Sequence, residues 1–155
     1  MFVVLPDIRS AQNVGAIFRT CDGAGVSKIF LTGYTPAPID EYNRARSDIS
    51  KAALGAEKTI VWEKVKSLGA LLKKFKASGV KIVAIEQSPN SVDYKKVKIG
   101  KNESVAFILG NEVDGLPKSI LSKCDVVAEI PMKGEKESLN VSVSAGIALF
   151  RILNI

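Results

Sequence analysis

The chain has 155 residues, a net charge of +6 and no histidine. Its length suits a single domain, residues 1–155, because domains usually hold about 100–200 residues, and its 46% hydrophobic content is enough to build a core. The absence of histidine excludes a histidine general base, a Ser-His-Asp triad and a histidine-ligated metal, while the positive charge is compatible with a polyanionic partner such as nucleic acid.

Apolar runs and helical periodicity predict an alternation of strands and helices. Short strands are expected at residues 2–5, 28–31, 59–62, 81–85, 105–109 and 126–130. Helices are expected from Asn13 to the glycines Gly23 and Gly25, at 65–77, 118–122 and 141–153, and within 40–53. The strands are continuous apolar runs, so both of their faces should be covered. The predicted fold class is therefore α/β, a mostly parallel sheet flanked by helices.

The last predicted helix is unusual because apolar side chains surround nearly all of its axis. They are Val141, Val143, Ala145, Ile147, Ala148, Leu149, Phe150, Ile152, Leu153 and Ile155. In so small a domain one helix has few neighbours to bury such a surface, so part of it is expected to contact a second copy of the chain. Closed two-fold symmetry is the usual arrangement and predicts a homodimer.

The cysteines and the N-terminus bear on the compartment. Cys21 and Cys124 lie far apart, so neither a zinc site nor a disulfide framework is expected, and reduced thiols are typical of a cytosolic protein. The N-terminus MFVVLPD has only a short apolar run without a basic flank, and no run reaches the ~18 apolar residues of a membrane helix. The prediction is a cytoplasmic protein with no metal and no membrane contact.

Two polar stretches near the ends of predicted elements are candidates for chemistry, whereas the nucleotide signatures GxGxxG and GxxxxGK[ST] are absent. In the first, residues 13–19, Asn13 suits a helix N-cap, Gly15 close packing and Arg19 a solvated charge. In the second, residues 109–117, a strand ends in a glycine-bounded turn. This turn is either a plain connection or a ligand site, because open α/β sheets bind ligands at the carboxyl ends of their strands.

A third stretch, residues 130–150, leaves a strand, runs through polar residues and re-enters the protein through Ser138-Leu139-Asn140. Ser138 or Asn140 could simply cap the following helix. The free N–H groups at a helix N-terminus can also face a ligand, which residues 133–137 would then cover. The residue pattern alone leaves both interpretations open.

Together, and in this order, the three stretches resemble the motifs of the SpoU/TrmH-type branch of the SPOUT methyltransferases. Asn13, Gly15 and Arg19 match an N-x-G-x-x-x-R motif. Residues 110–116 (GNEVDGL) match a G-N/P-E-x-x-G-L motif, and residues 130–132 with 138–141 match I-P-M…S-L-N-V. The spacing between the motifs also suits the family, and the resemblance spans nearly the whole chain.

The resemblance implies a fold and an activity that composition does not show. It implies a C-terminal segment threaded into a trefoil knot, whose loops bind S-adenosylmethionine, and a homodimer with the first and last helices at its interface. It implies methyl transfer to a ribose 2′-hydroxyl of tRNA or rRNA. The chain starts directly at the catalytic domain, so it looks like a minimal version in which RNA recognition rests on the dimer surface.

The resemblance also implies roles for individual residues. Arg19 is expected to bind a phosphate and stabilise the developing alkoxide, because a guanidinium is normally never deprotonated. Asn13 and Glu112 are expected to orient Arg19, and Ser138 and Asn140 to place the ribose and the cofactor. The expected cofactor-binding residues are Ile85, Glu86, Gln87, Leu109, Gly110, Asn111, Ile130, Met132 and Leu139.

Two other functions remain open at this point. A non-catalytic RNA-binding protein could retain the same fold, although the intact polar residues of all three motifs argue against it. Methylation of a base is the second alternative, and the Asn-Arg motif suits the ribose branch better. The sequence determines neither the RNA, nor the modified nucleotide, nor the need for a partner protein.

Overall fold

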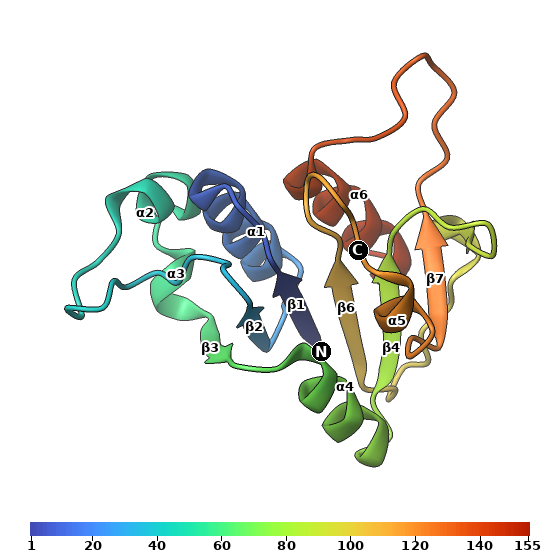
Figure 1. Cartoon of the computed structure of the whole chain (residues 1–155), viewed down its shortest axis with the longest axis horizontal. Helices are drawn as coiled ribbons and strands as arrows, with labels where there is room; N and C mark the ends of the chain where they lie inside the picture. Colours follow the sequence, from blue (N-terminus) through green and yellow to red (C-terminus); the bar gives the residue numbers. More distant parts are fainter.

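The computed structural model describes residues 1–155 and contains one seven-stranded sheet between two layers of helices (Figure 1). The strands are β1 Phe2–Pro6, β2 Lys28–Thr32, β3 Val61–Val65, β4 Lys81–Ile85, β5 Val92–Asp93, β6 Val105–Leu109 and β7 Val126–Glu129. Every strand pair is parallel, and the order across the sheet is β3-β2-β1-β6-β4-β7-β5. The predicted parallel α/β sheet is confirmed, while the knot stays a prediction.

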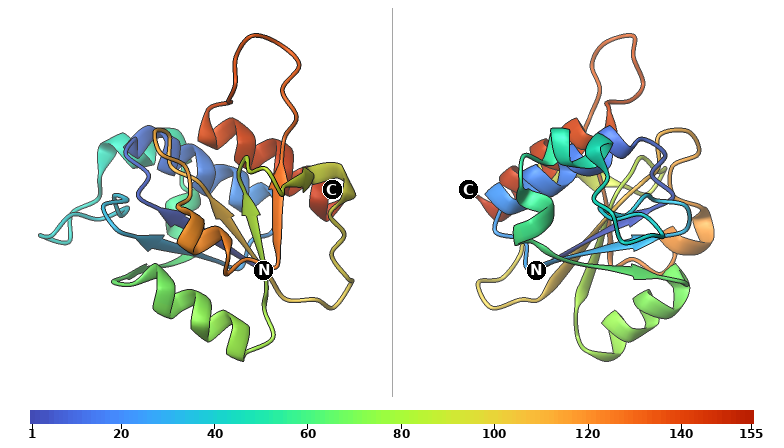
Figure 2. Two further views of the ribbon diagram at one scale, coloured as in Figure 1. Left: turned by 45° about the vertical axis from the view of Figure 1, so that its right-hand side comes forward. Right: turned by 90° about the vertical axis from the view of Figure 1, so that its left-hand side faces the viewer.

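The helices cover both faces of this sheet. They are α1 Ala11–Gly23, α2 Ser47–Ala53, α3 Ala56–Thr59, α4 Leu68–Ala77, α5 Lys118–Leu121 and α6 Val141–Leu153, with a 3₁₀ helix at Tyr94–Lys96. Helices α1, α2, α3 and α6 lie on one face and α4 and α5 on the other (Figures 1 and 2). None of these helices is long and apolar enough to cross a membrane.

The continuous apolar strands are explained by this two-sided cover. Within β1, Val3 and Leu5 belong to the larger core beneath α1 and α6, whereas Val4 belongs to the smaller core beneath α4 and α5. Strand β6 alternates in the same way, and all of its residues are buried. Because successive side chains of a strand point to opposite faces, each face needs apolar residues at every second position.

The predicted boundaries differ from the structure mainly around the third strand. Residues 59–62 were predicted as a strand, but Thr59 ends α3, and β3 runs from Val61 to Val65. Helix α4 starts at Leu68 and not at residue 65, because residues 61–65 form β3. The Ser67 side chain caps this helix by accepting a hydrogen bond from the Ala70 N–H at 3.2 Å. β3 is an edge strand without a buried residue, so it carries little of the apolar signal used for prediction.

Both cysteines are free thiols. Burial, with a smaller effect of the nearby Asp125 carboxylate, raises the pKa of Cys124 to about 11, and burial also raises the pKa of Cys21. Both side chains are therefore protonated at neutral pH and poor nucleophiles. The structure contains no cluster of three or more cysteine, aspartate or glutamate side chains that could hold a metal ion.

Gly15 lets α1 pack closely against α2. A Cβ added at Gly15 would clash with the Ile49 carbonyl oxygen and would lie 2.9 Å from the Ala52 Cβ. We expect Gly15→Ala to lower the free energy of unfolding by about 1–3 kcal/mol, although alanine is the better helix former, because backbone atoms of α2 must move. Urea unfolding would measure this loss.

Gly69→Ala is the matched control, because Gly69 lies in α4 with the Lys123 Nζ at an ordinary 3.6 Å from the added Cβ. It should leave stability unchanged or slightly raised. If Gly15→Ala were as stable as Gly69→Ala, the close packing of α1 on α2 would not be a constraint.

Candidate active site

The carboxyl ends of the central strands meet at one edge of the sheet. There β4 leads into Glu86 and Gln87, β6 into the turn 110–116, and β7 into residues 130–140, which project from the body in both views of Figure 2. An open pocket of about 660 Å³, including its mouth, lies among these segments. It is lined by Ile85, Glu86, Gln87, Leu109, Gly110, Asn111, Glu112, Ile130, Met132, Ser138, Leu139, Val141 and Ser144.

The pocket brings together most of the predicted site residues. All nine residues expected to bind the cofactor line it, and so do Glu112 and Ser138. The other three predicted catalytic residues, Asn13, Arg19 and Asn140, do not line it. Asn13 and Asn140 lie at its rim, where Asn13 is joined by hydrogen bonds to both Glu112 and Asn140.

Glu86 has a structural role inside the pocket that the sequence did not reveal. Its carboxylate accepts hydrogen bonds from the backbone N–H groups of Gln87 and Leu116, both at 2.8 Å. A Cβ added at Gly110 would clash with this carboxylate, and one at Gly115 would lie 2.5 Å from the Glu86 Oε2. The two glycines of the second motif therefore make room for the Glu86 carboxylate.

Asn111 holds the turn that follows β6. Its Oδ1 accepts from the N–H groups of Val113 and Asp114 at 2.9 and 2.8 Å, and its Nδ2 donates to the Gly115 carbonyl at 3.3 Å. The side chain is therefore occupied by its own turn, although Asn111 lines the pocket.

A chain of hydrogen bonds joins the three motifs at the rim of the pocket. Glu112 Oε1 accepts from the Asn13 Nδ2 at 2.9 Å, and Asn13 Oδ1 accepts from the Asn140 Nδ2 at 3.1 Å. The side chains come from α1, the turn after β6 and the start of α6, far apart in the sequence. The tertiary fold thus places one polar residue of each motif in a single network.

The helix caps explain why these amides are available. Asn13 does not cap α1 as the sequence suggested, because Ser10 is the cap and its Oγ accepts from the Asn13 N–H at 3.2 Å. Asn140 does cap α6, since its Oδ1 accepts from the Ser142 N–H at 2.8 Å, which leaves its Nδ2 free to reach Asn13. Asn140 is therefore both a cap and a member of the network.

Glu112 is held as a carboxylate by its donors. Burial by itself would raise its pKa, but hydrogen bonds from the Asn13 amide and from the N–H groups of Arg9 and Ser10 outweigh burial and keep the pKa below its usual range. An ionised carboxylate with three donors is a poor proton acceptor at neutral pH, so Glu112 is suited to positioning Asn13.

The lowered pKa of Glu112 predicts a pH-dependent stability. A depressed carboxyl pKa stabilises the fold above the pKa of the unfolded state, about 4.3, and this stabilisation disappears as the pH falls through the folded-state pKa. We expect the wild type to melt a few degrees above Glu112→Gln at neutral pH, and this difference to shrink below about pH 4. Thermal melts across the acid range would test it.

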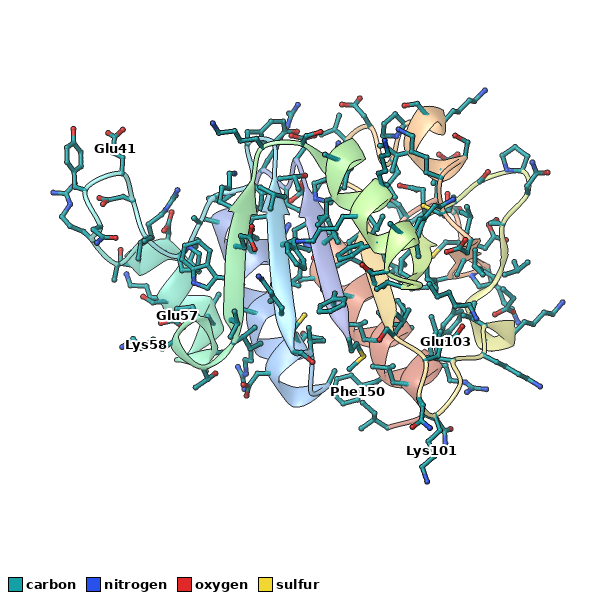
Figure 3. The ribbon with its side chains drawn as sticks, turned by 90° about the horizontal axis from the view of Figure 1, so that it is seen from below. Glu41, Glu57, Lys58, Lys101, Glu103 and Phe150 are labelled. Atoms are coloured by element: carbon teal, nitrogen blue, oxygen red, sulfur yellow. The ribbon has the colours of Figure 1, made fainter.

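Glu41→Gln serves as the control, because Glu41 is exposed at the tip of the loop between β2 and α2 and makes no hydrogen bond (Figure 3). Its melting temperature should follow that of the wild type at every pH. A difference between wild type and Glu112→Gln that stayed constant with pH would contradict the assignment.

Arg19 lies apart from the hydrogen-bond network at the rim of the pocket. The expected contacts from Asn13 and Glu112 to Arg19 are absent, because Glu112 is occupied by Asn13, Arg9 and Ser10. Arg19 is exposed and makes no side-chain hydrogen bond or ion pair within the chain. It lies six residues after Asn13, about 9 Å further along α1, so neither Asn13 nor Glu112 contacts it within one chain, and their role in orienting it stays a prediction.

The structure adds residues that sequence reasoning missed. Val141 and Ser144 line the pocket from the first turn of α6, where their spacing of three puts them on one face. The start of α6 was predicted correctly, so this spacing was a usable signal. The backbone contacts of Arg9 and Ser10 to Glu112 had no signal in the sequence, because they depend on the pairing of β1 with β6.

The fold and the site define a class of protein: a parallel α/β sheet with a pocket at its carboxyl edge, lined on one side by the segment that leads into the last helix. Residues 1–150 match the family model described as the SpoU rRNA Methylase family. The chain belongs to this family, and the resemblance drawn from the three motifs is confirmed.

Individual relatives support the same assignment. The chain is 34% identical over 149 residues to the 23S rRNA (guanosine-2′-O-)-methyltransferase RlmB of Neisseria meningitidis serogroup B, covering 96% of this chain and 56% of that protein. It superposes on the AdoMet-bound rRNA methyltransferase from Sinorhizobium meliloti with a TM-score of 0.87 at 32% identity, covering 99% of this chain and 55% of that one.

A third relative is the A. aeolicus TrmH/SpoU tRNA modifying enzyme, with a TM-score of 0.83 at 29% identity over 99% of this chain and 73% of that one. The chain spans about half the length of the curated relatives it matches.

Proposed function

We propose that this protein is an S-adenosylmethionine-dependent RNA methyltransferase that acts on a ribose 2′-hydroxyl of tRNA or rRNA. The observation that carries the proposal is the Glu112–Asn13–Asn140 network at the rim of the pocket. Membership of the SpoU family, and relatives named as a 2′-O-methyltransferase and an AdoMet-bound rRNA methyltransferase, support it. A tRNA or rRNA substrate further implies a cytoplasmic location.

The pocket fits S-adenosylmethionine in its chemistry. Six apolar side chains in its lining suit the faces of an adenine ring. The Glu86 carboxylate has lone pairs left beyond its two backbone donors and suits ribose hydroxyls, and the carboxylates of Glu86 and Glu112 together favour a cation. When bound, S-adenosylmethionine supplies a methyl group already activated on a positively charged sulfur.

The residues of the chain would then align the acceptor. Asn13 is hydrogen-bonded to both Glu112 and Asn140, so the two amide groups are held in place beside the pocket, and Ser138 presents a hydroxyl in its lining. Alignment of two reactants can contribute ~7–11 kcal/mol to lowering a barrier. Arg19 would bind a phosphate of the RNA and stabilise the negative charge that develops on the 2′-oxygen.

A homodimer is part of the proposal. Val143, Ile147 and Phe150 on α6 are 48%, 36% and 38% exposed and lie on the side of α6 away from the sheet. Phe150 lies against the end of α1, because its Cζ is 3.5 Å from the point that a Cβ added at Gly23 would occupy (Figure 3). A second copy on this face would also cover the neighbourhood of the exposed Arg19 on α1.

The dimer is tested by placing charge on its proposed interface. Val143→Asp with Ile147→Asp should convert a dimer into a folded monomer, because two buried carboxylates without partners oppose association. Light scattering after size-exclusion chromatography would give the masses. Val61→Asp, at an exposed valine on the edge strand β3, should leave the wild-type mass unchanged; a monomeric wild type would refute the dimer.

The reaction is tested in two steps. Calorimetric titration with S-adenosylhomocysteine should show one binding site per chain. Total RNA from cells that lack the gene would then be incubated with protein and S-adenosylmethionine, digested to nucleosides and analysed by mass spectrometry. A 2′-O-methylnucleoside is expected. A methylated base would support a base methyltransferase, and no cofactor binding, even with RNA present, would support a non-catalytic RNA-binding protein.

A further inference from the structure

The pocket and its rim provide for the methyl donor and the acceptor ribose, but an RNA extends beyond one ribose. The same edge of the sheet continues from β6 to β1 and then to β2. The residues that follow these two strands include the exposed side chains of Arg9 and Tyr34. Because β2, β1 and β6 are neighbours in the sheet, the loops that carry Arg9 and Tyr34 follow the pocket in a row along its edge, with about 4.8 Å between neighbouring strands.

The two loops that carry these side chains are fixed to each other. The buried Thr35 hydroxyl donates to the Leu5 carbonyl at 2.7 Å and accepts from the Ile8 N–H at 2.9 Å. Asp7 Oδ1 accepts from the Tyr34 N–H at 3.1 Å. Asp7 itself has a φ of +54°, a backbone conformation that persists only where the surroundings enforce it. Arg9 and Tyr34 therefore project from a rigid base.

Arg9 is also tied directly to the site. Its backbone N–H donates to the Glu112 Oε2 at 3.1 Å, a contact that a substitution of the side chain leaves in place. Its Nε donates to the Tyr34 hydroxyl at 3.5 Å, which leaves the outer edge of the guanidinium free, and no carboxylate forms an ion pair with it. Tyr34 is 53% exposed, so one face of its ring is open to solvent.

We propose that Arg9 and Tyr34 form a subsite for a nucleotide that flanks the methylated one, with the Tyr34 ring stacking on its base and the Arg9 guanidinium binding a phosphate. Stacking on an aromatic side chain and pairing with arginine are the two ways in which single-stranded RNA is held without reading its sequence. Tyr34 follows β2, two strand spacings or about 10 Å from the turn that carries Glu112, which suits a neighbouring nucleotide. The inference rests on the proposed RNA methyltransferase activity.

The chain contains a second arginine–tyrosine pair that serves as a matched control. Arg44 lies 4.9 Å from the centre of the Tyr42 ring, on the loop that extends away from the sheet (Figure 1). Its guanidinium forms an ion pair with Asp40 at 2.8 Å, so it is already neutralised. Both pairs combine an exposed arginine with an exposed tyrosine, but only Arg9 and Tyr34 follow strands beside the pocket and lack an ion pair.

The experiment measures methyl transfer to total RNA from cells that lack the gene, together with calorimetric binding of S-adenosylhomocysteine. Arg9→Ala and Tyr34→Ala should each raise the KM for RNA about tenfold, with kcat and S-adenosylhomocysteine affinity near the wild-type values. Tyr34→Phe keeps the ring and should behave like the wild type. Arg9→Ala should also reduce the slope of log(kcat/KM) against log salt by about 0.7–0.9, as expected for one lost phosphate contact.

The outcomes separate this inference from the function on which it rests. An active wild type whose KM is unchanged in Arg9→Ala and Tyr34→Ala would overturn the subsite alone. So would a Tyr34→Phe variant as impaired as Tyr34→Ala, or an equal rise in KM for Tyr42→Ala with Arg44→Ala. A wild type that binds no S-adenosylhomocysteine and transfers no methyl group would overturn the proposed function and the subsite together.

Discussion

Gly110→Ala should weaken S-adenosylhomocysteine binding at least about 100-fold, equivalent to ~3 kcal/mol, in a calorimetric titration. The added Cβ occupies the place of the Glu86 carboxylate and would also lie 3.2 Å from the Gly115 Cα. Either Glu86 leaves its two N–H donors or the turn after β6 moves, and both changes alter the pocket wall. Because the turn also carries Glu112, methyl transfer should be lost as well.

A double variant separates the two causes of this loss. Glu86→Ala combined with Gly110→Ala removes the clash with the carboxylate, and Glu86→Ala alone shows the effect of losing the acceptor of the Gln87 and Leu116 N–H groups. If the Glu86 carboxylate binds the cofactor ribose, affinity will stay low in the double variant. If affinity returns, the Glu86 carboxylate is not needed for cofactor binding, and the clash alone causes the loss in Gly110→Ala. Wild-type affinity in the single Gly110→Ala variant would show that this pocket is not the cofactor site.

Arg19→Ala should reduce the rate of methyl transfer at saturating RNA by about 100- to 1,000-fold, the usual cost of removing one group that stabilises developing negative charge. S-adenosylhomocysteine affinity and melting temperature should stay near wild type, because Arg19 is exposed, makes no contact within the chain and does not line the pocket. Single-turnover rates together with calorimetry would measure both effects.

Arg151→Ala is the matched control for Arg19→Ala, since Arg151 is an exposed arginine at the end of α6 and is equally free of ion pairs. It should retain the wild-type rate. Equal losses of rate and cofactor affinity in Arg19→Ala would contradict the division of roles between the pocket and Arg19. If the rate were lost together with the dimer, Arg19 would act by holding the two copies together.

The buried strands could be predicted because apolar residues occupy almost the whole of each strand. β4 and β6 were predicted at their observed bounds, and α6 as well. β5, with two residues, and α3, with four, were missed because such short elements have no measurable periodicity. β3 was displaced because it lies at the edge of the sheet, where exposed Lys64 and Glu63 interrupt the apolar pattern.

The pocket lining was predicted from motif positions, whereas its internal contacts were not. The sequence marked Gly110 as a cofactor-binding residue, but it did not show that Gly110 makes room for the Glu86 carboxylate. It suggested that Asn13 caps α1, but Ser10 does so, and the Asn13 amide is free for Glu112 and Asn140. The contacts that were missed, Glu86 beside Gly110 and Asn13 with Glu112 and Asn140, join residues far apart in the sequence.

The sequence by itself determined the α/β class, the central strands, the last helix and the residues of three motifs, because periodicity and motif spacing are local properties. The tertiary structure decided which of those residues meet. Inserting β6 between β1 and β4 brings Glu112 beside Arg9, Ser10 and Asn13, and the projecting segment before α6 adds Asn140. Hydrogen bonds of this kind depend on atoms within about 3 Å, a distance that only strand order and helix packing can set.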